Sequence, residues 1–121
     1  MLWRNLQELR AELVSGGWKT PCTYAREFSE AGNFPAVYLF ALVDREDHQR
    51  ALVAYVGMST CLKRRWDTHN ILPELEACAH WPMRWFRRMD RAALREAERA
   101  LIHRFDPPWN IVGRRRGVLL S

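Results

Sequence analysis

Two phenols, a guanidinium, an imidazole, a carboxylate and an amide stand on predicted strands, helices and a turn of this sequence. They belong to Tyr38, Tyr55, Arg65, His69, Glu98 and Asn110. A carboxylate can hold a divalent cation, a guanidinium pairs with phosphate oxygens, and an imidazole takes up a proton near neutral pH. Together these side chains suit metal-assisted cleavage of a phosphodiester.

Glu98 is the most informative of these residues. It lies in a predicted helix whose apolar side chains form one stripe, made of Leu94, Ala97, Leu101, Ile102 and Phe105. Glu98 falls inside that stripe, whereas Glu96 falls on the polar side. Burial of an unpaired carboxylate is unfavourable by several kcal/mol, so we expect Glu98 to pair either with an arginine or with a divalent cation.

The other candidate residues are grouped by spacing. Arg65 and His69 are four residues apart and would share one helix face. Tyr38 and Tyr55 lie on two predicted strands and could face one side of a sheet if the register allows. A tyrosine pKa lies near ~10, so a tyrosine would need a nearby cation to act as a base at neutral pH, and His69 is the easier base. Each residue alone is also explained by surface exposure or packing, so the combination carries the interpretation.

Gly57 and Asn110 stand at boundaries of predicted elements. Gly57 follows Tyr55-Val56, where a residue without a side chain permits a close backbone approach. Asn110 follows Asp106-Pro107-Pro108-Trp109 and could simply cap a turn.

Hydrophobic periodicity and turn residues predict the elements that must position these side chains. Met83, Trp85 and Arg87 would alternate with Arg84, Phe86 and Arg88 along one strand. The predicted elements are a helix over 2–14 ended by Ser15-Gly16-Gly17, strands over 36–43 and 51–58 joined by the polar loop 44–50, a helix from Ser59 or Thr60 to about Asn70, a further segment over 73–79, a strand over 82–89, and a helix over 90–105 that begins at Asp90 and ends before Pro107-Pro108.

Size and charge narrow the class of protein. A chain of 121 residues makes one domain with a core of its own. The net charge of +5 and the pI near 9.6 favour a polyanionic partner. The excess charge gathers in three largely arginine clusters: Lys63, Arg64 and Arg65; Arg84, Arg87, Arg88 and Arg91; and Arg114, Arg115 and Arg116.

Membrane, secreted and zinc proteins are disfavoured. No apolar run approaches the roughly 20 residues of a membrane span, and the first ten residues do not resemble a signal peptide. The three cysteines lack a paired spacing, so we expect reduced thiols in a cytoplasmic protein. A zinc site built from Cys61, His69, Cys78 and His80 is a remote alternative.

The order of these motifs resembles the GIY-YIG nuclease family. Ala36-Val37-Tyr38 stands where the family has Gly-Ile-Tyr, and Tyr55-Val56-Gly57 stands where it has Tyr-Ile-Gly. Arg65 and His69 match the spacing of the family's catalytic arginine and the following histidine or tyrosine. The segment EAERALIHRFDPPWN resembles the metal-binding helix and carries Glu98 and Asn110. The departures are Ala36 in place of glycine and the extra length of the loop 44–50.

The resemblance implies a fold and a mechanism. The fold is α+β, a three-stranded antiparallel sheet flanked by helices, here with an extra N-terminal helix. Glu98 would hold one Mg²⁺ or Mn²⁺, Arg65 would stabilise the transition state, and Asn110 would brace the site. Tyr38, Tyr55 and His69 would position and deprotonate the attacking water, and which of them is the base stays open.

The basic residues predict the nucleic-acid contacts. We expect DNA, with RNA less favoured, to contact Gly57, Ser59, Lys63, Arg64, Arg87, Arg88, Arg114 and Arg115. Residues 1–35 would form a helical extension that packs on the nuclease-like domain 36–121, and the N-terminal helix could mediate a homodimer or bind a larger partner. Two alternatives remain open: a catalytically inactive nucleic-acid-binding module on the same scaffold, and a partner-binding protein.

Overall fold

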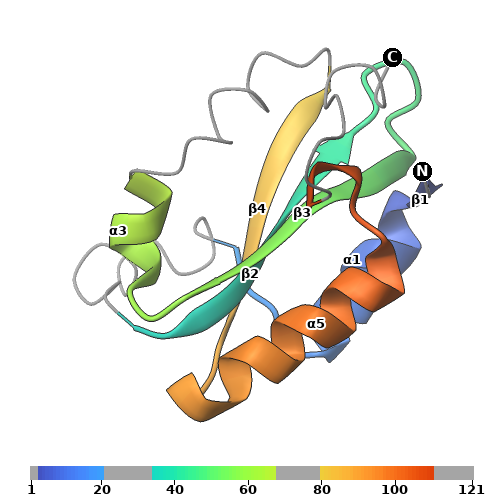
Figure 1. Ribbon diagram of the computed structural model, residues 1–121. Helices are drawn as coiled ribbons and strands as arrows, with labels where there is room; N and C mark the ends of the chain where they lie inside the picture. Colours follow the sequence, from blue (N-terminus) through green and yellow to red (C-terminus); the bar gives the residue numbers. More distant parts are fainter. Residues whose placement is uncertain (1–2, 21–33, 68–79, 111–121) are drawn as a thin grey trace.

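The computed structural model describes residues 3–20, 34–67 and 80–110 (Figure 1). The fold of this part is α+β with an antiparallel sheet, as expected. Its elements are β1 (Arg4–Asn5), α1 (Leu6–Ser15), β2 (Ala36–Val43), β3 (Arg50–Ser59), α3 (Leu62–Asp67), β4 (Trp81–Arg88), the 3-10 turn η1 (Arg91–Ala93), α5 (Leu94–Phe105) and the 3-10 turn η2 (Pro108–Asn110).

The sheet has four strands in the order β1-β3-β2-β4, so the expected count of three strands was wrong. The additional strand is β1, where Arg4 pairs with Ala51 and Asn5 pairs with Arg50. Asn5 explains this difference, because its side-chain oxygen accepts a hydrogen bond from the Glu8 N–H at 3.0 Å and so caps α1. The helix therefore begins at Leu6 rather than at residue 2, and the two residues before it are extended and pair with β3.

The central strand is β2, with all eight residues buried between β3 and β4. It spans the predicted residues 36–43, and β3 and β4 differ from their predicted bounds by one residue at each end. The predicted helix over 90–105 opens as η1, and Asp90 precedes it without a capping side-chain hydrogen bond. The predicted segment 73–79 and the chain beyond Asn110 lie outside the described residues.

Buried side chains form two clusters, one on each face of the sheet. On one face, strand residues pack with Leu9 and Leu13 of α1 and with Leu94 and Phe105 of α5, the two helices that lie side by side in Figure 1. The other face, which we call the Tyr38 face, is covered by α3 and η2 and consists of Phe34, Ala36, Tyr38, Phe40, Leu42, Ala54, Leu62, Trp66, Phe86 and Trp109, with Tyr55 packed against it.

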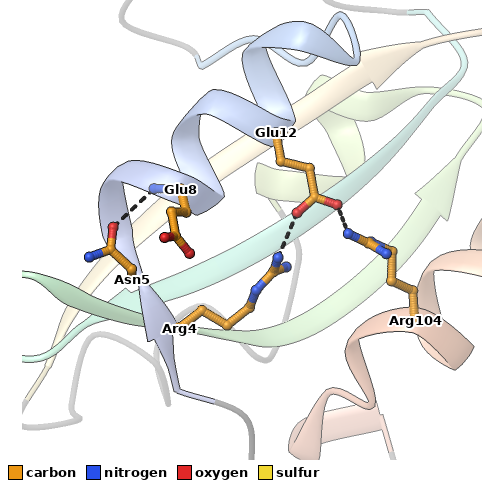
Figure 2. A network of polar contacts seen from close by, with 5 residues as sticks. All are labelled: Arg4, Asn5, Glu8, Glu12 and Arg104. Atoms are coloured by element: carbon orange, nitrogen blue, oxygen red, sulfur yellow. Dashed lines mark hydrogen bonds and ion pairs between the residues drawn. The ribbon is translucent and has the colours of Figure 1, made fainter.

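One carboxylate links three elements on the helical face. Glu12 of α1 accepts a hydrogen bond from Arg4 of β1 at 2.7 Å and a second one from Arg104 of α5 (Figure 2). The N-terminal helix is thus joined to the sheet and to the C-terminal helix by polar contacts as well as by its buried leucines. Within the described residues, no helix is long and apolar enough to cross a membrane.

Candidate active site

The two phenols lie on the same face of the sheet. In the β2–β3 pairing, Tyr38 is opposite Gly57 and Phe40 is opposite Tyr55. Directly opposed residues share a face, and so do residues two apart on one strand, so Tyr38 and Tyr55 point to one side. The register shifts only after Phe40, where Ala41 pairs with Val53, and this irregularity explains why Val53 packs on the other face although it is two residues from Tyr55. The ring centroids of the two tyrosines are 6.3 Å apart.

Gly57 makes the position of Tyr38 possible. A Cβ atom built at Gly57 would lie 2.4 Å from Cζ of Tyr38 and 2.5 Å from its hydroxyl oxygen. The phenol therefore lies directly over the backbone of β3, where any side chain would collide with it. This is the close approach that the glycine after Tyr55-Val56 indicated.

Packing holds the Tyr38 ring and affects its ionisation. Its centroid is 5.3 Å from that of Phe40 and 5.9 Å from that of Trp66, and only 1% of the residue is exposed. Burial raises the pKa of Tyr38 well above its ordinary value, and the neighbouring Tyr55 raises it further. Tyr38 thus keeps its proton at neutral pH and can donate a hydrogen bond.

Two further predicted residues act on the same phenol. The Arg65 side chain lowers the pKa of Tyr38, whereas the charge of Glu98 raises it. Tyr38 comes from β2, Tyr55 from β3, Arg65 from α3 and Glu98 from α5. Tyr55, Arg65 and Glu98 thus each influence the ionisation of the Tyr38 phenol, with Glu98 acting from α5, which packs on the opposite face of the sheet. His69 lies outside the described residues.

Local contacts hold α3, the helix that carries Arg65. The Ser59 side-chain oxygen accepts a hydrogen bond from the Cys61 N–H at 3.0 Å, and the Leu62 N–H donates to the Phe34 carbonyl at 3.1 Å. Leu62 and Trp66 of this helix are buried on the Tyr38 face. Arg65 is half-buried beside them.

Glu98 lies in the half-buried stripe of α5, as the sequence pattern indicates. Leu94 and Phe105 are buried, while Ala97, Leu101 and Ile102 pack partly buried against the core. Burial raises the pKa of the half-buried Glu98, and the charge of Arg95 only partly offsets that effect. The ionised carboxylate would therefore gain from a further cation, which fits a residue that binds Mg²⁺ or Mn²⁺.

The zinc alternative gains no support from the described part of the chain. Cys78 and His69 lie outside it, and no group of three or more His, Cys, Asp or Glu side chains gathers among the residues that the structure describes. A single metal-binding carboxylate at Glu98 does not require such a group.

Asn110 binds the backbone of β3 between the two signature residues. Its Oδ1 accepts a hydrogen bond from the Val56 N–H at 2.8 Å, and its Nδ2 donates to the Val56 carbonyl at 2.7 Å. The amide thus pairs with Val56 as a neighbouring strand would, at an edge that β1 does not reach. Trp109, buried beside Asn110, anchors this turn. Asn110 therefore holds the backbone of β3 at Val56, between Tyr55 and Gly57.

The predicted nucleic-acid contacts divide between the two sides of the sheet. Ser59 lies at the end of β3, and Lys63 and Arg64 lie on α3, next to the Tyr38 face. Arg88 is opposite Ala36 and shares that face, whereas Arg87 is opposite Val37 and belongs to the other side. Arg114 and Arg115 lie outside the described residues.

Arg84 is a residue that the prediction missed. It is opposite Phe40 and lies on the Tyr38 face, with its guanidinium carbon 5.7 Å from the centroid of the Trp66 ring. The signal was present in the sequence, since the alternation of Arg84, Phe86 and Arg88 already groups these three side chains.

A cavity of about 260 Å³ lies elsewhere, lined by Trp3, Arg4, Val53, Arg104 and Phe105. None of the candidate catalytic residues lines it, so it is not part of the site around Tyr38. No family model, curated protein or solved structure matches this chain.

Proposed function

We propose that this protein is a divalent-metal-dependent endonuclease of the GIY-YIG type that hydrolyses phosphodiester bonds in DNA. One observation carries the proposal: the Tyr38 phenol lies over the backbone of Gly57 with its ring centroid 6.3 Å from that of Tyr55, and Tyr55, Arg65 and Glu98 all influence its ionisation. A phenol, a guanidinium and a carboxylate gathered in this way can orient water, bind a phosphate and hold a cation.

The cation would be bound by Glu98. When bound, Mg²⁺ or Mn²⁺ supplies a Lewis acid that polarises the scissile phosphate and neutralises developing charge. The raised pKa of Glu98 supports this role, because the ionised carboxylate lacks full compensation from the described protein groups.

The remaining side chains have separate tasks. Arg65 binds the scissile phosphate and stabilises the additional charge that develops on its oxygens. Tyr38 stays protonated and donates a hydrogen bond that orients the water or a phosphate oxygen, because burial opposes its ionisation. The base that takes the proton from the attacking water is therefore His69, or Tyr55 with its phenol ionised beside a cation. Asn110 keeps the strand of Tyr55 in position through its two hydrogen bonds to Val56.

Cleavage of supercoiled and branched DNA tests this function. We expect the wild type to cut with Mg²⁺ or Mn²⁺ and to stop cutting in EDTA. Glu98→Gln removes the charge but keeps the shape, and we expect a loss of roughly a hundredfold or more in rate. Glu96→Gln, an exposed position two residues away on the same helix, is the matched control and should cut normally.

The pH dependence provides a second readout. Because the pKa of Glu98 is raised, protons compete with the metal above the ordinary carboxyl pKa of 4.5. The cleavage rate should therefore fall on the acid side, and a higher metal concentration should move that fall to lower pH. Equal rates for wild type and Glu98→Gln would refute the enzyme; DNA binding without cleavage in every sample would instead indicate the inactive binding module.

A further inference from the structure

Two arginines of β4 share the face that carries the candidate site. Arg84 is opposite Phe40 and Arg88 is opposite Ala36, with Phe86 between them opposite Tyr38. These partners belong to the Tyr38 face, and side chains two residues apart on a strand point to the same side. Arg84 and Arg88 are four residues apart on one strand, which places their Cα atoms about 13 Å from each other along the face.

Aromatic rings hold both guanidinium groups. The guanidinium carbon of Arg84 is 5.7 Å from the Trp66 ring centroid, and that of Arg88 is 5.0 Å from the Phe34 ring centroid. The Trp66 ring also contacts the Tyr38 ring, with centroids 5.9 Å apart, so Arg84 is one ring away from the candidate catalytic phenol. Stacking uses the flat face of a guanidinium, whereas its N–H groups lie in the plane and are the groups that bind phosphate.

A third cation comes from the segment after α1. Lys19 forms an antiparallel bridge with Phe86 on the outer edge of β4, with both N–H to O=C hydrogen bonds made, at 2.8 and 2.9 Å. Directly opposed residues in such a pair point to the same face. Lys19 therefore joins the Tyr38 face beside Phe86, between the positions of Arg84 and Arg88 along the strand.

We infer that Lys19, Arg84 and Arg88 form a phosphate-binding row that holds a nucleic-acid strand along β4 and leads it to Tyr38. This inference rests on the proposed nuclease function and adds the path of its substrate. A row of cations spaced along a strand fits a polymer with repeated phosphates, and its contacts are with the backbone rather than the bases. Lys63 and Arg64 of α3 extend the positive charge on the same side, where Asp67 is the acidic residue of that helix.

Binding in EDTA tests the row without cleavage. Fluorescence anisotropy of a labelled DNA duplex would be measured against salt for the wild type, Arg84→Gln/Arg88→Gln and Lys19→Gln. Each lost phosphate contact lowers the slope of log affinity against log salt by roughly 0.9. We therefore expect the double variant to lose about 1.8 of that slope and the lysine variant about half as much.

Controls separate the row from net charge and from folding. Arg87→Gln removes one charge from the same strand on the opposite face, and Arg10→Gln removes one from an exposed position of α1. Both should lower the slope less than either single change, Arg84→Gln or Arg88→Gln. Arg84→Lys/Arg88→Lys should keep the slope. If the double glutamine variant unfolds, the two single variants, each with half of its expected loss, provide the test.

The outcomes distinguish this inference from the proposed function. An unchanged slope in Arg84→Gln/Arg88→Gln would overturn the row even if the wild type cuts DNA. The row would also be overturned if Arg87→Gln and Arg10→Gln each lowered the slope as much as Arg84→Gln or Arg88→Gln does. Loss of slope as expected, with no cleavage in Mg²⁺ or Mn²⁺, would support the row and refute the nuclease. A wild type that does not bind nucleic acid would overturn both.

Discussion

At the scale of single residues, the contact between Gly57 and Tyr38 provides a sharp test of how the phenol is held. In Gly57→Ala, the added Cβ would lie 2.4 Å from the ring, and the ring cannot retreat easily because Phe40, Tyr55 and Trp66 surround it. We expect a loss of about 1–3 kcal/mol in the free energy of unfolding, measured by urea denaturation, together with reduced cleavage.

Gly16→Ala is the matched control for that substitution. Gly16 has a φ of −82°, and a Cβ there would have its nearest neighbours at 3.4 Å. The change in unfolding free energy should stay within about 0.5 kcal/mol. Equal stability of Gly57→Ala and the wild type would contradict the close packing of the phenol on β3.

At the scale of elements, Glu12 joins α1 to β1 and α5 (Figure 2). Burial alone would raise the pKa of Glu12, but the hydrogen bonds and charges of Arg4 and Arg104 together hold it below the ordinary value of 4.5. A carboxyl pKa that is lower in the folded state contributes stability above the unfolded value, and that stability is lost as the pH falls through the folded value.

We therefore expect Glu12→Gln to lower the unfolding free energy by about 0.5–1 kcal/mol at neutral pH, a modest amount because the pair is partly solvated. The difference from the wild type should shrink below pH 4.5 as the wild-type carboxyl group gains its proton. Thermal unfolding across pH measures this. Glu8→Gln, on the exposed side of the same helix, is the control, and an equal effect there would contradict the role of the network.

At the scale of the whole molecule, the net charge of +5 favours binding to a polyanion and makes the affinity depend on salt. Contacts with about 6 phosphates would cost roughly a thousandfold in affinity between 50 and 200 mM salt. We expect that fall for duplexes of unrelated sequence, measured by anisotropy in EDTA. Affinity that depends on sequence but hardly on salt would instead indicate base recognition.

The N-terminal helix also belongs to this scale. Its leucines at positions 9 and 13 are buried against the sheet, and Val14 is its large exposed apolar side chain. The apolar face of α1 is thus largely buried against the rest of the molecule. That this helix binds a second chain stays a prediction.

Local patterns were enough to predict much of this protein. A continuous apolar run predicts β2, a 3.6-residue period predicts α5, and the same period reveals Glu98 as a polar residue within a half-buried stripe. Glycine after Tyr55-Val56 indicates a close approach whatever lies above it. Such features depend on neighbours along the chain, so the sequence by itself determines them.

Contacts between distant residues needed the tertiary structure. The face that Tyr55 shares with Tyr38 depends on the register between β2 and β3, and Asn110 hydrogen-bonds to Val56, 54 positions away in the chain. Whether Arg84 or Arg87 lies beside the site depends on which face of β4 packs against Trp66. Asn5 likewise caps α1, so the helix begins at Leu6, although the leucine periodicity alone would extend it towards residue 2. The strand register, the face on which a side chain lies and the first residue of a helix depend on contacts that form only when the chain folds. The tertiary structure therefore decided them.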